Sequence, residues 1–128
     1  MEILTTNGIT ISVDTCYMPD DSSPLHGRFI FAYHILIGNG LPFVVQLLRR
    51  HWLIVDAAGQ VREVEGEGVV GQQPVLEPGA SYAYASWCDL PTEIGRMSGT
   101  YLMQRLHDKS LFEVLIPEFK LVAPIKLN

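Results

Sequence analysis

Ile9–Tyr17, with the sequence ITISVDTCY, is the stretch that decides the fold, because its side chains alternate in character along the chain. One side carries Ile9, Ile11, Val13, Thr15 and Tyr17, and the other carries Thr10, Ser12, Asp14 and Cys16. Successive side chains of a β-strand point to opposite faces of a sheet. The alternation therefore predicts a strand with one face in the core and one in solvent.

Six further segments show strand patterns, and the breaks between them are rich in Gly, Pro, Asn and Asp. They cover residues 28–39, 43–56, 61–65, 81–87, 96–106 and 111–124. The first is apolar on both faces, which is typical of a central strand. The second is long enough to bend near Arg49 and Arg50, and residues 57–60 (AAGQ) predict a hairpin turn after it.

The predicted fold is an all-β sandwich of about seven strands, of the immunoglobulin-like or fibronectin type III-like kind. No window of twelve or more residues carries an uninterrupted helical stripe of apolar side chains. The length of 128 residues and the 48% share of hydrophobic residues suit a single domain over residues 1–128.

Charge and cysteine content exclude several classes of function. The formal net charge is -5, and nine Lys and Arg residues are too few for a nucleic-acid or acidic-membrane partner. The N-terminus carries neither a basic segment nor a long apolar run, so we expect a cytoplasmic protein. Cys16 and Cys88 stand far apart, outside any zinc-motif spacing, and are predicted to be free thiols.

A glycine-rich segment, GEGVVG, matches the Gly-x-Gly-x-x-Gly pattern of dinucleotide-binding loops. It comprises Gly66, Glu67, Gly68, Val69, Val70 and Gly71. In those proteins a helix follows the glycines and its N-terminus holds the pyrophosphate. Here Pro74 and Pro78 leave no room for a helix, and no lysine is present to make a P-loop. The interpretation we favour is that the glycines shape a tight or left-handed loop.

A weak anion site without a helix is the alternative for this segment. Arg49, Arg50 and His51 approach it if their strand pairs with residues 61–65, as the AAGQ turn suggests. Backbone amides together with these side chains would then hold pyrophosphate or a nucleotide, with a divalent cation joining Glu65 or Glu67 to the phosphates.

Neither catalysis nor a metal site is predicted from residue spacing. Ser81, Ser86 and Ser98 lack a nucleophile-elbow sequence, Cys88 has no neighbouring base, and the carboxylates of VREVEGE alternate as a solvated face does. No two of the four histidines are spaced by two or four residues, so we expect no metal and no cofactor. Ligands that converge from separate segments stay open as an alternative.

Longer stretches identify the chain as a relative of a known family. The run from Leu47 to Ser86, LLRRHWLIVDAAGQVREVEGEGVVGQQPVLEPGASYAYAS, with GRMSGTYLM at 95–103 and IPEFKL at 116–121, strongly resembles the bacterial ApaG family. The resemblance implies a fibronectin type III-like sandwich with no established enzymatic activity. It also implies an association with cobalt resistance and magnesium efflux, and the family's glycines suggest a possible pyrophosphate binder. Similar domains occur in larger eukaryotic proteins, where they are interpreted as protein-binding modules.

Protein binding through the glycine-rich segment is therefore the function that we expect. Val69 and Val70 either contact a partner or cap one end of the core. Trp87, the last residue of the 81–87 strand, stands where the following turn is expected to begin, and it is either an exposed anchor or a core residue. The family resemblance implies a small residue such as Gly at this position. The partner is unidentified, and both monomer and homodimer remain open.

Overall fold

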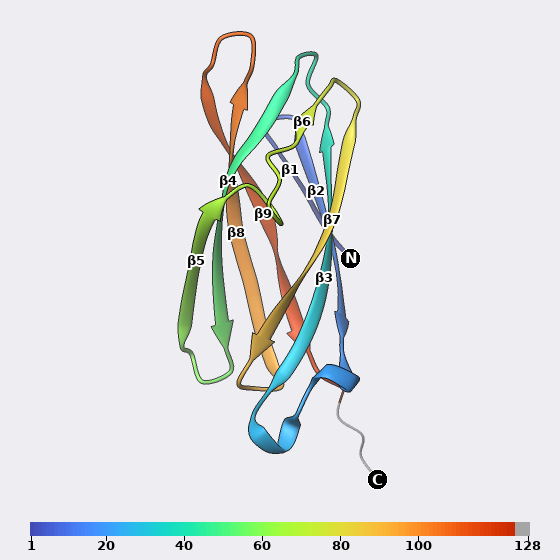
Figure 1. The fold of residues 1–128 in the computed structure, drawn as a ribbon, viewed down its shortest axis with the longest axis vertical. Coiled ribbons are helices and arrows are strands. Elements are labelled where there is room, and N and C mark those ends of the chain that lie inside the picture. The colour runs from blue at the N-terminus through green and yellow to red at the C-terminus, as the bar shows by residue number, and fades with distance from the viewer. Residues whose placement is uncertain (125–128) are drawn as a thin grey trace.

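The structure, a computed structural model, describes residues 1–124, and they form two antiparallel sheets packed face to face (Figure 1). Its elements are β1 (Glu2–Thr6), β2 (Ile9–Tyr17), β3 (Phe29–Asn39), β4 (Val45–Asp56), β5 (Val61–Glu67), β6 (Val75–Leu76), β7 (Ser81–Leu90), β8 (Ile94–Arg105) and β9 (Leu111–Val122), with two short 3-10 helices, η1 (Pro19–Asp21) and η2 (Pro24–His26), between β2 and β3. The predicted all-β sandwich is confirmed.

The first sheet has the strand order β1-β2-β3-β7. Its first hairpin turns through Asn7 and Gly8, which both have positive φ, at 51° and 83°. Asn-Gly is the preferred pair for such a two-residue turn because Asn and Gly accept the left-handed conformation. β3 pairs with β2 on one side and β7 on the other, as the apolar character of both its faces predicted.

The second sheet has the order β5-β4-β8-β9, and the two-residue strand β6 pairs with the start of β4. β4 bends where the sequence predicted, because a bulge interrupts its register with β8 between Leu47 and Arg49. A second irregularity lies between Met97 and Gly99 of β8. The AAGQ turn is confirmed, and it pairs β5 with β4 so that His51 lies opposite Glu65.

Alternating apolar residues of both sheets fill the space between them. On β2, Ile9, Ile11 and Val13 are almost fully buried, as the alternation predicted. The centre of the core is aromatic: Trp52 of β4 packs edge-on against Tyr33, Tyr101 and Phe119, with ring centroids 5.5, 6.4 and 5.9 Å away.

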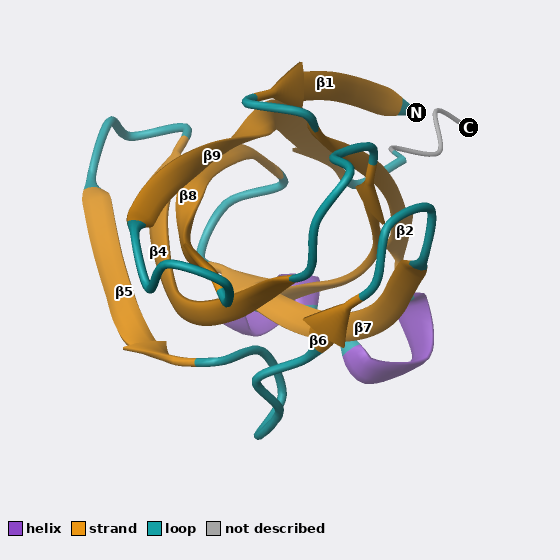
Figure 2. Cartoon of the chain, turned by 90° about the horizontal axis from the view of Figure 1, so that it is seen from above, coloured by secondary structure: helices purple, strands orange, loops and turns teal. Residues whose placement is uncertain are grey.

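Viewed from above, the two sheets curl around this core almost like a barrel (Figure 2). On the side of β1 the Asn7 side-chain amide donates to the Glu113 carbonyl of β9, which ties the two sheets together. On the other side β5 and β7 are the neighbouring edges, and the chain between β5 and β6 projects from the body as a loop (Figure 2). None of the helices within residues 1–124 has the length and apolar character needed to cross a membrane.

Two strands went unpredicted. β1 has no buried face, because Ile3 and Leu4 are both exposed, so its sequence carries no alternation to detect. β6 has only two residues. The predicted end of the strand that contains Trp87 was wrong. β7 continues to Leu90, so Trp87 lies inside the strand and not at the turn.

Candidate functional site

The glycine-rich segment, residues 66–71, leaves the end of β5 and turns back on itself. Gly66 and Glu67 are the last residues of β5, and Val69 and Gln72 then form an isolated antiparallel bridge. Each of these two residues donates its N–H to the other's carbonyl, at 2.8 and 3.0 Å. The central residues Val70 and Gly71 have φ of 47° and 76°, which is the pattern of a two-residue hairpin turn.

Val69 and Val70 have opposite surroundings. Val69 is fully buried and belongs to the core, so for this residue the predicted cap over the core is the observed arrangement. Val70 is 61% exposed at the tip of the turn. Its left-handed φ is rare for a β-branched residue, since the branched side chain crowds the backbone there.

Gly68 is the point at which the loop is attached to the sheet. Its N–H donates to the Leu48 carbonyl at 2.8 Å, and the Gln73 side-chain amide donates to the same carbonyl at 3.0 Å. Leu48 is the residue displaced by the bulge in β4, which frees its carbonyl for the loop. A Cβ on Gly68 would lie 2.2 Å from the Gln72 carbonyl oxygen, so glycine is required for this close approach.

Arg50, a residue of β4, holds the loop through side-chain hydrogen bonds. Its guanidinium Nη1 donates to the carbonyls of Glu67 and Gly68, at 2.9 and 3.1 Å. It also packs on Gly66, where a Cβ would lie 2.8 Å from Nη1. Several donors that a phosphate could use are thus already bonded to the chain: Nη1 of Arg50 and the amides of Gly68 and Val69. This geometry favours the structural interpretation of the glycines.

Three tyrosines, two buried and one half-buried, lie in the electrostatic range of Arg50. Tyr84 and Tyr101 share a hydrogen bond between their hydroxyls. Burial is the main cause that raises the pKa of Tyr33, Tyr84 and Tyr101, and the charge of Arg50 lowers each pKa only in part. All three phenols therefore keep their protons at neutral pH, so they act as hydrogen-bonding groups.

A second group of polar side chains lies on the outer face of β4 and β5. His51 Nε2 lies 2.6 Å from Glu63 Oε1 and 3.8 Å from Glu65 Oε1. One ligand atom of each residue, an imidazole nitrogen or a carboxylate oxygen, lies within 4.8 Å of the other two. Spacing along the chain missed this group because His51 is 12 and 14 residues from its partners; the AAGQ turn, which pairs the two strands, was the available signal.

The chain as a whole has counterparts among known proteins. A family profile described as ApaG domain matches residues 19–105, which is more than half of the chain. The chain belongs to the ApaG family. Protein ApaG of Paramagnetospirillum magneticum is 50% identical over 120 residues, covering 94% of this chain and 92% of the relative. Protein ApaG of Anaeromyxobacter dehalogenans is 46% identical over 128 residues, with both chains fully covered.

A solved ApaG-like structure shares the fold. The crystal structure of the putative ApaA protein from Bordetella pertussis superposes with a TM-score of 0.87 at 44% identity, covering 92% of this chain and 95% of that one. The predicted membership of the ApaG family is confirmed.

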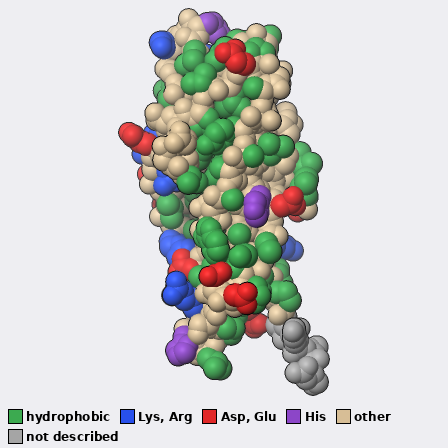
Figure 3. Space-filling model, turned by 45° about the vertical axis from the view of Figure 1, so that its right-hand side comes forward, with side chains coloured by type: hydrophobic (Ala, Val, Ile, Leu, Met, Phe, Trp, Pro, Cys, Tyr) green, Lys and Arg blue, Asp and Glu red, His purple; other side chains and the backbone are tan. Residues whose placement is uncertain are grey.

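Trp87 is 56% exposed. The resemblance to the ApaG family implied a small residue at this position, so the chain departs from the family here. Trp87 faces outward from β7 and lines a surface hollow with Asp21, Arg28 and Asp89. The same face of the first sheet also carries exposed Leu36, and apolar side chains lie across it among a few charged ones (Figure 3). Of the two sequence interpretations, burial in the core does not apply to Trp87.

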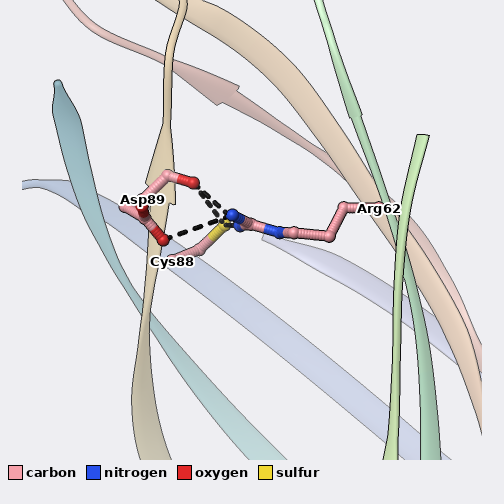
Figure 4. A network of polar contacts seen from close by, with 3 residues as sticks. All are labelled: Arg62, Cys88 and Asp89. Carbon is pink, nitrogen blue, oxygen red and sulfur yellow. Dashed lines mark hydrogen bonds and ion pairs between the residues drawn. The ribbon is translucent and has the colours of Figure 1, made fainter. Parts of the chain in front are cut away.

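Arg62 lies away from the glycine-rich segment and joins β5 to β7. Its Nη2 donates to the Asp89 carbonyl at 2.8 Å, and its Nη1 lies 3.4 Å from Asp89 Oδ1 (Figure 4). Nη2 also lies 3.6 Å from the sulfur of Cys88, which is buried and free. Burial raises the pKa of the Cys88 thiol to about 11, although the nearby Arg62 opposes this. Arg62 therefore links the neighbouring edges of the two sheets.

The strain at Val70 predicts that Val70→Asn stabilises the protein. Asn accepts the left-handed region far better than Val, as the Asn7-Gly8 turn of the same chain illustrates. We expect the free energy of unfolding to rise by about 1 kcal/mol in urea denaturation followed by circular dichroism. Val61→Asn is the control, because Val61 is 63% exposed in β5 and gains nothing from the change. A fall in stability for Val70→Asn would contradict the assignment of strain.

Proposed function

We propose that this ApaG-family chain is a non-enzymatic protein-binding module that recognises its partner with the glycine-rich segment, and that Val70 is the central contact residue. The observation that carries the proposal is the state of Val70. An exposed apolar side chain sits at the tip of a turn, in a backbone conformation that disfavours it. Strain of this kind concentrates at functional positions, where the side chain is kept for what it contacts.

The rigid mounting of the loop supports the proposal. Buried Val69, the close approach of Gly68 to Gln72, and the two hydrogen bonds from Arg50 hold the tip in one position. A loop that is ordered before binding loses little conformational entropy when a partner docks. Recognition residues are commonly carried on loops that a rigid scaffold positions.

Two features favour binding over catalysis and over a phosphate ligand. The high pKa of Cys88 leaves very little thiolate at neutral pH, which argues against a cysteine nucleophile. Glu63, Glu65 and Glu67 surround the base of the loop, and their charge repels a phosphate. We place the protein in the cytoplasm, where exposed Cys16 would stay reduced. Effects on cobalt and magnesium, which the family resemblance implied, would arise through the partner.

Cross-linking from position 70 tests the proposal. Val70→Cys in a Cys16→Ser background presents one accessible thiol, because Cys88 is buried and stays protonated. A thiol-linked photo-cross-linker at this position, illuminated in cell lysate, is expected to yield a discrete adduct with one protein. Mass spectrometry of the adduct identifies the partner.

The matched control places the same cross-linker at Val61, which is equally exposed but lies far along β5 from the loop tip. We expect the adduct to be absent or several-fold weaker from position 61. Adducts of equal yield and composition from both positions would sink the proposal, because they would reflect collision and not recognition. Pyrophosphate or ATP at millimolar concentration is added in parallel, and loss of the adduct would favour the phosphate alternative.

A further inference from the structure

The side chains of His51, Glu63 and Glu65 converge on the outer face of the β4–β5 pair. His51 and Glu65 lie directly opposite each other in the strand register, and Glu63 is two residues from Glu65 on the same face. Neighbouring strands hold opposite residues within a few ångströms, so the backbone places the three side chains within reach of one another. His51 Nε2 is 2.6 Å from Glu63 Oε1 and 3.8 Å from Glu65 Oε1.

These distances suit a small divalent cation. Zinc binds imidazole nitrogen and carboxylate oxygen at about 2.0–2.2 Å, so ligand atoms around one ion stand roughly 3.4 Å apart. The three ligand atoms already lie within 4.8 Å of one another. Because the three side chains share one face of two paired strands, we expect rotamer changes of the glutamates to bring their oxygens to bonding distance without movement of a strand. A simple pair of His51 and Glu63 would not explain why Glu65, the third of these side chains, also lies beside the imidazole.

The surroundings supply charge, access and further oxygen ligands. Glu67 shares this face of β5, and Glu113 lines an adjoining hollow of about 190 Å³ together with Arg49 and Arg50. The four carboxylates outnumber the two arginines among these groups, so the field favours a bound dication. The side chains of His51, Glu63 and Glu65 are 35%, 59% and 60% exposed, which leaves the centre of the triad open to solvent and to water ligands.

We propose that His51, Glu63 and Glu65 form a surface site for a divalent transition metal of the zinc type. Imidazole among the ligands selects zinc-like ions over magnesium, which prefers an all-oxygen shell. A bound ion would clamp β5, which pairs with β4 as an edge strand, and would replace the His51–Glu63 ion pair.

Titration calorimetry with ZnCl₂ on the full chain tests the site, in a Cys16→Ser background that removes the exposed thiol. We expect one site per chain at pH 7.5 and much weaker binding of MgCl₂. His51→Gln and Glu65→Gln are each expected to lower the zinc affinity at least tenfold. Both side chains are partly exposed, so circular dichroism is expected to report the same fold.

Two controls and a second readout make the result decisive. His107→Gln and Glu118→Gln change an exposed histidine and an exposed carboxylate elsewhere on the surface, and both are expected to bind zinc as the parent does. Zinc is also expected to raise the melting temperature of the parent, and not that of His51→Gln, because an ion that binds only the folded state stabilises it. Equal affinity of His51→Gln and the parent, or no heat and no shift in melting temperature for the parent, would overturn the proposal.

Discussion

Gly68→Ala is expected to lower the free energy of unfolding by about 3 kcal/mol. The added Cβ would lie 2.2 Å from the Gln72 carbonyl oxygen and 2.9 Å from its carbon, and backbone atoms on both sides have little freedom to move. The left-handed φ of 64° adds a strain of about 1 kcal/mol for any residue with a side chain. The rest of the loss comes from distorting the Gly68–Leu48 hydrogen bond and the packing of Val69. Urea denaturation followed by circular dichroism measures the change.

Gly71→Ala separates the two causes. Gly71 also has a positive φ, at 76°, but a Cβ there meets nothing within 4 Å. Its expected loss is therefore about 1 kcal/mol, from backbone strain alone. Equal losses for the two substitutions would contradict the claim that Gly68 is required for close approach to Gln72.

Trp52→Ala is expected to lower the free energy of unfolding by about 4 kcal/mol, because it leaves a large cavity at the centre of the sandwich. Trp52 is only 2% exposed and makes edge contacts with Tyr33 and Phe119 from β3 and β9, so it joins the two sheets. Thermal or urea denaturation followed by far-ultraviolet circular dichroism measures the change. This signal does not depend on the fluorescence of the tryptophan that the substitution removes.

The other tryptophan of the chain provides the control. Trp87 is 56% exposed on the outer face of β7, and we expect Trp87→Ala to change the free energy of unfolding by less than about 1 kcal/mol. A loss at Trp87 comparable to the loss at Trp52 would contradict the assignment of the core between the sheets.

The strands with one buried face were predictable from the sequence alone. Alternation in Ile9–Tyr17 placed Ile9, Ile11 and Val13 in the core, and the structure buries all three. The AAGQ turn set the register that brings His51 opposite Glu65. β1 was not predicted because it joins the sheet without burying its side chains, so its sequence shows no alternation of apolar and polar residues.

Side-chain direction near the loop was beyond the reach of sequence patterns. The sequence brought Arg49, Arg50 and His51 alike toward the segment. The bulge at Leu48 alters the alternation of β4, and it is Arg50 that reaches the carbonyls of Glu67 and Gly68. Val69 and Val70 are identical in type, and only the tight turn between Val69 and Gln72 buries the first and exposes the second. One displaced backbone residue therefore decides how the glycine-rich segment is held.

Trp87 was misplaced for a similar reason. The turn residues after it suggested that its strand ends at position 87, yet β7 continues to Leu90 because Cys88 and Leu90 reach the core. Odd positions of β7 consequently face outward, and Trp87 with them. A tryptophan in an alternating strand is equally compatible with either face, so the sequence left its burial open.

The most direct test of the proposed recognition by Val70 is a paired measurement on Val70→Asn: recovery of the cross-linked partner from lysate by immobilised protein, and the free energy of unfolding of the same sample. If Val70 is kept at the tip for binding, the substitution lowers partner recovery at least tenfold while the free energy of unfolding rises by about 1 kcal/mol. Val61→Asn is expected to leave recovery unchanged. Undiminished recovery by the stabilised Val70→Asn protein would contradict the account.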